Sequence, residues 1–119
     1  MKTTSIGEPR LRELESELAQ QQAHMNAAMA RWLALLAEYD RRSDDVGTTF
    51  EGWVAWRFGV SYWEAAELVR VARALPELPV IRAAFERGEL TFAKVRALTR
   101  VATPACEERL LRLAVALAA

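Results

Sequence analysis

The longest regular pattern of apolar and polar positions runs through residues 8–42. Apolar or tolerated residues recur there at alternating intervals of three and four, which is the heptad repeat of a left-handed coiled coil. These positions are Leu11, Leu14, Leu18, Gln21, Met25, Ala28, Trp32, Leu35 and Tyr39. Pro9 suits the first turn of a helix. The pattern predicts one long helix, preceded by a disordered N-terminus over residues 1–7.

The two halves of this predicted helix differ in the width of their apolar face. A second stripe at Met29, Leu33 and Leu36 widens the face of the second half, whereas Arg and Glu flank the narrow first half. We expect the second half to pack on the domain and the first half to project and pair in a homodimer. The expected dimer contacts are Leu11, Leu14, Leu18, Met25 and Trp32. An ordinary amphipathic helix packed on its own chain explains the pattern equally well, because short heptad runs are common in bundles.

Residues 48–119 contain a series of helix start and stop signals, after a polar loop at residues 43–49. The expected N-caps are Thr48, Ser61, Thr91 and Thr103. The expected stops are Gly59, the prolines at 76 and 79, and Gly88. No segment alternates with period two, so the predicted fold is all-α, with the long helix followed by a bundle of about five shorter helices. The apolar period continues to residue 119, so we expect this domain to be truncated at its C-terminus.

The apolar positions of the shorter helices also give expected burial. Phe50, Trp53, Val54 and Phe58 fall on or near one face of their helix, and core packing is expected for Trp53 and Trp56. In the next helix the inward positions are Ala65, Leu68, Val69, Ala72 and Leu75. In the helix after Thr91 they are Phe92, Val95, Leu98 and Val101. Trp63 is the one tryptophan expected to be substantially exposed.

The stretch FGVSYWEAAELVRVARAL, residues 58–75, has the form of a helix-turn-helix. Gly59 supplies a turn that costs other residues energy, and Ser61 caps a second helix whose first turns would enter the major groove. Glu64 and Glu67 would repel phosphates, whereas nearby arginines could contact them. The expected DNA contacts here are Arg57, Ser61, Tyr62, Trp63, Arg70 and Arg73. Tyr62 and Trp63 would serve equally well as anchors of a protein interface.

Composition adds few constraints on function. The 119 residues are 52% hydrophobic and 27% charged, which predicts a folded core. Sixteen basic and sixteen acidic residues cancel, which argues mildly against strong nonspecific DNA affinity. Residues 1–49, with six basic and eight acidic side chains, have a net charge of −2. Residues 50–100, with eight basic and six acidic side chains, have a net charge of +2, and this region holds the helix-turn-helix stretch.

The search for catalytic chemistry is short. One His and one Cys, His24 and Cys106, lie far apart in the sequence and cannot supply a typical zinc site. No Gly-rich phosphate loop is present. We therefore expect no enzymatic activity, no metal and no cofactor. Without a signal peptide or an apolar run that could span a bilayer, a cytoplasmic protein with no membrane contact is expected.

The run from GWVAWRFGVS through VRALTRVATP resembles the actinobacterial 13E12 repeat family, a domain of unknown function that usually precedes an HNH endonuclease domain. The resemblance covers roughly residues 25–119. The HNH part has no counterpart here, so nuclease activity is not implied for this chain. The order GVS, helix, L-P pair, G-E-L-T and helix is also similar to the helix-turn-helix of ParB-type partition proteins. That similarity implies DNA binding by residues 61–75, supported by the helix after Thr91, which carries Lys94.

Together these observations predict a DNA-binding helix-turn-helix module of an HNH-nuclease-associated family, paired through its long helix. The alternative is a protein–protein interaction module, an adaptor or an inhibitor, that uses the long helix and the exposed aromatic residues. The possible partners are therefore double-stranded DNA, a second copy of the chain, or another protein.

Overall fold

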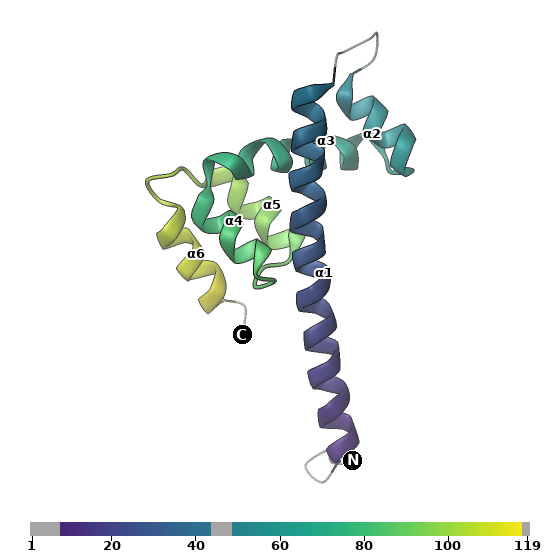
Figure 1. The fold of residues 1–119 in the computed structure, drawn as a ribbon. Coiled ribbons are helices and arrows are strands. Elements are labelled where there is room, and N and C mark those ends of the chain that lie inside the picture. The colour runs from purple at the N-terminus through teal and green to yellow at the C-terminus, as the bar shows by residue number, and fades with distance from the viewer. Residues whose placement is uncertain (1–7, 44–48, 118–119) are drawn as a thin grey trace.

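The computed structural model describes residues 8–43 and 49–117 (Figure 1). Within these ranges the regular structure is entirely helical, which confirms the all-α prediction and the long first helix. The α-helices are α1 (Pro9–Arg42), α2 (Phe50–Phe58), α3 (Tyr62–Ala74), α4 (Pro79–Glu86), α5 (Phe92–Val101) and α6 (Glu107–Ala116). A 3₁₀ turn, Leu75–Glu77, joins α3 to α4. The predictions for residues 1–7 and for Thr48 lie outside the described residues. None of the helices in the described ranges is both long and apolar enough to cross a membrane.

Helix α3 is the centre of the molecule. It contacts α1, α2 and α5, while α4 packs between α1 and α6 (Figure 1). The N-terminal half of α1 extends beyond this body, and the molecule measures 61 × 35 × 20 Å. Its radius of gyration is 17.5 Å, whereas a compact domain of this length should have about 13.5 Å. The protein is therefore a small helical body with one protruding helix.

Short-range hydrogen bonds explain why most helices begin and end where they do. The Ser61 hydroxyl accepts from the Glu64 amide at 3.0 Å, and the Thr91 hydroxyl accepts from the Lys94 amide at 3.2 Å. Both N-caps were predicted, and so was the left-handed conformation of Gly59, with φ of 71°. At α2 the N-cap is Thr49, whose hydroxyl accepts from the Gly52 amide.

The start of α6 also differs from the prediction. The regular helix begins at Glu107, four residues after the expected cap Thr103. The Cys106 sulfur accepts from the Thr103 amide and hydroxyl, both at 3.3 Å, and this local turn delays the regular helix. Glu107 is buried and its carboxylate accepts from the amides of Val80 and Ile81. A side chain of α6 therefore caps the start of α4 and holds the two helices together.

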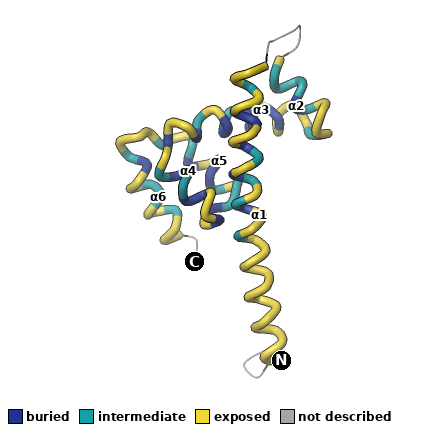
Figure 2. Tube along the Cα trace, viewed as in Figure 1, coloured by how far each residue is buried: buried dark blue, intermediate teal, exposed yellow. Residues whose placement is uncertain are grey.

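The core forms where α1, α3, α4 and α5 meet (Figure 2). The five inward positions predicted for the second helix of the helix-turn-helix stretch are all buried. Val95 and Leu98 of α5 are buried as expected, but Val101 is 65% exposed. The inward position after Leu98 falls to Ala102, four residues later, which packs against the core and leaves Val101 facing solvent.

A close backbone contact determines where α1 leaves the body. The Asn26 side-chain amide donates to the Gly88 carbonyl at 3.1 Å, and Gln22 donates to the Asn26 side chain at 2.8 Å. Gly88 has a φ of 83°, and a Cβ placed there would lie 2.5 Å from the Ala23 carbonyl oxygen. A side chain at this position is therefore excluded by both backbone conformation and space.

We predict that Gly88→Ala lowers the free energy of unfolding by about 2–5 kcal/mol. About 1–2 kcal/mol comes from the left-handed conformation and about 1–3 kcal/mol from the clash with α1. Gly59→Ala is the matched control, since Gly59 has a similar φ of 71° and an added methyl group would meet no atom within 4 Å. That variant should lose only the conformational part, about 1–2 kcal/mol. Urea unfolding of both variants measures the difference, and equal losses would contradict a contact between α1 and Gly88.

Candidate functional site

The two sides of α1 have different surroundings. Residues 26, 30, 33, 36 and 37 are buried against the body, whereas residues 9–22 are all exposed (Figure 2). The predicted heptad positions lie along the side that the body leaves uncovered. The strongly exposed apolar side chains among them are Leu11, Leu14, Leu18, Met25, Leu35 and Tyr39. We call these six residues the α1 seam. Trp32 lies on the same line but is half-buried, because its ring meets Phe58 edge-on at 5.3 Å.

Helix α2 adds an aromatic wall beside the C-terminal half of the seam. Tyr39 stacks on Trp53 with ring centroids 4.7 Å apart, and Trp53 in turn meets Phe58 edge-on at 5.9 Å. Between α1 and α2 these rings line an apolar groove of about 170 Å³ together with Trp32, Leu35 and Leu36. The groove is open to solvent along the seam, because Leu35 and Tyr39 on its edge are half exposed.

Core packing was the wrong expectation for Trp56, whose side chain is 78% exposed. Helix α2 buries only Val54 completely, and a residue two positions later points to the opposite side of a helix. Trp53, one residue before Val54, is half-buried. The prediction for Trp63 was right, since this residue is 60% exposed.

The predicted helix-turn-helix stretch has the expected local geometry but little free surface. Six of the thirteen residues of α3 are buried, and after the first turn Ala66 and Arg70 are partly exposed and Arg73 is exposed. Tyr62 and Trp63 in its first turn are exposed. Arg57 of α2 is also exposed, with its guanidinium 5.5 Å from the centre of the Phe58 ring. The first turn of α3 is thus its most exposed part.

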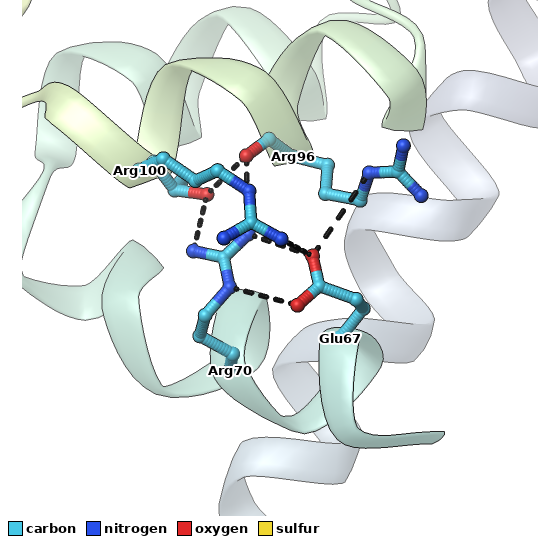
Figure 3. A network of polar contacts seen from close by, with 5 residues as sticks. Glu67, Arg70, Arg96 and Arg100 are labelled. Atoms are coloured by element: carbon cyan, nitrogen blue, oxygen red, sulfur yellow. Dashed lines mark hydrogen bonds and ion pairs between the residues drawn. The ribbon is translucent and has the colours of Figure 1, made fainter. Parts of the chain in front are cut away.

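Three arginine side chains from α3 and α5 converge on one carboxylate (Figure 3). Glu67 is 8% exposed and accepts from Arg70 at 3.1 and 3.3 Å and from Arg100 at 2.6 Å. The Arg96 guanidinium lies 4.0 Å from the same carboxylate. Arg70 also donates to the Thr99 hydroxyl and to the Arg96 carbonyl, which ties α3 to α5. We call Glu67, Arg70, Arg96 and Arg100 the arginine cluster.

The arginine cluster carries more positive charge than its one carboxylate can neutralise. The hydrogen bond from Arg70, assisted by the charges of Arg70 and Arg100, lowers the pKa of Glu67 below its usual value. The carboxylate is therefore ionised at neutral pH, and three guanidinium groups surround one negative charge. The Arg96 guanidinium also lies 5.3 Å from the centre of the Trp63 ring. This places an exposed aromatic side chain next to a cluster with a net charge of +2.

Several side chains expected to contact DNA have partners within the chain. Arg73 donates to the Asp40 carboxylate at 2.6 and 3.1 Å, which raises the pKa of its guanidinium further, and it lies 3.8 Å from Glu51. Arg73 therefore bridges α3 to α1 and α2. Lys94 donates to the Ala114 carbonyl at 3.2 Å, so it links α5 to α6. Of the predicted DNA contacts, the structure brings Trp63 and Arg70 together, since both contact Arg96.

Sequence reasoning did not single out Arg96 and Arg100. They are four residues apart, which places both on one face of α5, and their side chains are 39% and 52% exposed. The spacing was visible in the sequence, but the proximity of both to Glu67, and of Arg96 to Trp63, follows from the packing of α5 on α3. Within the described residues, no group of three or more His, Cys, Asp or Glu is placed to hold a metal ion.

The comparison with protein families places this chain. Residues 9–119 match the family described as Domain of unknown function (DUF222), from the first residue of α1 onward. The chain belongs to the DUF222 family. No curated protein and no solved structure matches it. This membership agrees with the sequence resemblance as far as a domain of unknown function is concerned.

We predict that Glu67 makes the stability of the DUF222 domain depend on acid pH. Because its folded pKa is lowered, its contribution is fully present above the unfolded value of about 4.3 and is lost as the pH falls through the folded value. Glu67→Gln should lower the free energy of unfolding by about 1–3 kcal/mol at pH 7. The difference in unfolding free energy between this variant and the unmodified protein should shrink below about pH 4. Glu86→Gln, which removes an exposed carboxylate from α4, controls for the loss of one charge. Chemical unfolding between pH 3 and pH 7 measures all three proteins, and a difference that does not vary with pH would refute this role.

Proposed function

We propose that this DUF222 domain is a binding module without catalytic activity that self-associates through α1. The observation that supports this proposal is the α1 seam. Exposed apolar side chains occupy heptad positions in both halves of the helix, from Leu11 to Tyr39. Monomeric proteins rarely leave so long an apolar stripe in water, and stripes of this kind mark interaction sites.

The position of the seam also supports pairing rather than internal packing. Residues 9–22 extend away from the body and are all exposed, although they form regular helix (Figures 1 and 2). An isolated helix of this length is marginally stable in water, since most helical stability in proteins comes from packing of the apolar face. A partner helix on the seam would supply that packing.

DNA binding is the second candidate function, and the arginine cluster is the observation that favours it. Arg96 and Arg100 are partly exposed, and Arg96 lies against the Trp63 ring, so their positive charge can reach a phosphate or a base. The contact would use the exposed first turn of α3 together with α5. Pairing through α1 would present two copies of this surface, as two-fold DNA-binding proteins do. An association with an HNH nuclease domain rests on the sequence resemblance and belongs to this candidate.

We predict that Leu14→Glu with Leu18→Glu converts a dimer into a monomer. The two added charges lie on the seam, where pairing would have to bury them. Ser16→Glu with Gln20→Glu is the matched control, because it adds the same charge to the same exposed turns but away from the seam. Sedimentation equilibrium should give about twice the 13.4 kDa chain mass for the unmodified protein and the control, and the chain mass for the seam variant. A chain mass for the unmodified protein at all concentrations would exclude self-association.

For the second candidate, we predict that Arg96→Gln with Arg100→Gln weakens binding to a DNA duplex and reduces its salt dependence. Losing two phosphate contacts should lower the slope of log K against log salt by about two units. Arg82→Gln with Arg87→Gln removes the same charge from partly exposed positions in and directly after α4 and should change the slope little. Titrations at several salt concentrations provide the comparison. If the unmodified protein does not bind DNA even at low salt, this candidate is rejected.

A further inference from the structure

We infer that two copies of α1 pair antiparallel, so that the projecting half of each helix covers the docked half and the α1–α2 groove of the other. This inference rests on the proposed self-association and adds its direction and register. The seam spans both halves of α1, and the contact with Gly88 divides the helix near its midpoint. The projecting residues 9–22 and the docked residues 26–42 are each roughly 21–25 Å long at the usual helical rise. An antiparallel pair centred near Ala23 therefore places each half beside its counterpart of similar length.

The seam side chains are complementary in this register. Leu11 faces the partner's Leu35, Leu14 faces the partner's Trp32, and the large Leu18 faces the partner's small Ala28. Gln21 and Met25 from the two chains meet near the two-fold axis. Of the two apolar positions in each heptad, the first on one helix packs against the second on the other, as in antiparallel coiled coils. Leu11, Leu14 and Leu18, which are exposed in a single chain, would thus cover the exposed edge of the groove formed by Leu35, Tyr39 and the rings of α2.

The charges beside the seam favour the same register. The flanking positions one residue before the seam are occupied by Arg10, Glu17, Arg31 and Glu38, and all four are exposed. In the antiparallel register Arg10 faces the partner's Glu38 and Glu17 faces the partner's Arg31. Because the dimer is two-fold symmetric, each of these two pairs occurs twice, which gives four pairs of opposite charge. In a parallel pair Arg10 would face the partner's Glu15, but Glu17 and Arg31 would face Gln22 and Leu36, so most of this complementarity would be lost.

The ion pairs that these side chains make within one chain do not prevent them from forming ion pairs with a second copy of α1. Arg10 lies 3.3 Å from Glu17, and Arg42 lies 3.2 Å from Glu38. Both pairs are on the solvent-exposed surface, where an ion pair contributes little to stability. The side chains can therefore turn toward a partner helix at small cost.

The position of α2 also argues against a parallel pair. Phe58 and Trp53 of α2 stand beside the seam at Trp32 and Tyr39, at the end of α1 that also carries the body (Figure 1). Parallel pairing would bring two copies of α2 together over the seam. Antiparallel pairing brings α2 against the projecting half of the other helix, where residues 9–22 are all exposed.

Crosslinking of single-cysteine variants tests the direction. In a Cys106→Ser background, His24→Cys lies next to its own counterpart only in the antiparallel pair, and Leu18→Cys only in the parallel one. Ser16→Cys, on the side of α1 opposite the seam, measures crosslinking by random collision. With a short bifunctional maleimide, we expect a covalent dimer for His24→Cys and only the collision level for the other two. Efficient crosslinking of Leu18→Cys, or of none of the three in a protein with dimeric mass, would overturn the antiparallel register and leave self-association intact. A monomeric mass would reject both.

Charge reversal gives a second, independent test. Arg10→Glu should weaken the dimer about fivefold, because two facing pairs are lost across the two-fold axis. Adding Glu38→Arg should restore the affinity in the antiparallel register, since the two new charges face each other. Adding Glu15→Arg instead should restore it in a parallel pair. Rescue by Glu15→Arg and not by Glu38→Arg would therefore refute the inference.

Discussion

The contact between α1 and the turn at Gly88 sets the shape of the molecule. Asn26 binds the Gly88 carbonyl, and the absence of a side chain at Gly88 allows the Ala23 backbone to approach closely. On the N-terminal side of Ala23, residues 9–22 of α1 are all exposed. One hydrogen bond and one glycine thus divide a single helix into a half that belongs to the core and a half whose apolar side chains face water.

This division explains why α1 carries two apolar stripes. The stripe through Ala30, Leu33 and Ala37 is buried in the body, and the seam through Leu11, Leu18 and Leu35 is not. A helix that only packed on its own chain would need one stripe. The second stripe, the aromatic groove of α2 and the alternating charges beside the seam all face the same solvent-exposed side. The proposed self-association would account for these three features together.

The arginine cluster shows how a sequence signal for DNA binding can be used for structure. Arg70 and Arg73 were expected to contact phosphates, but Arg70 binds Glu67 and Arg73 binds Asp40. The Arg73–Asp40 bond fastens α3 to α1, and Arg70 fastens α3 to α5 through the Thr99 hydroxyl and the Arg96 carbonyl. What is left for a ligand is the excess charge of Arg96 and Arg100 on the neighbouring helix α5, with Arg96 against the Trp63 ring.

Local signals in the sequence were enough to predict much of the fold. The caps at Ser61 and Thr91, the turn at Gly59 and the buried face of α3 depend on residues close in sequence, and each was predicted correctly. The errors arose where distant segments decide the outcome. Trp56 is exposed because α2 is covered on one side only, and the inward position of α5 falls on Ala102 instead of Val101. The arginine cluster could not be foreseen, because it requires the packing of α5 on α3.

Amide hydrogen exchange along α1 at several protein concentrations tests the central claim most directly. Residues 26–40 include the five residues of α1 that are buried against the body, whereas residues 9–22 are all exposed. If the seam pairs, protection of residues 9–22 should rise with concentration and approach that of the docked half. Rapid exchange of residues 9–22 at every concentration, with residues 26–40 protected throughout, would contradict self-association through α1.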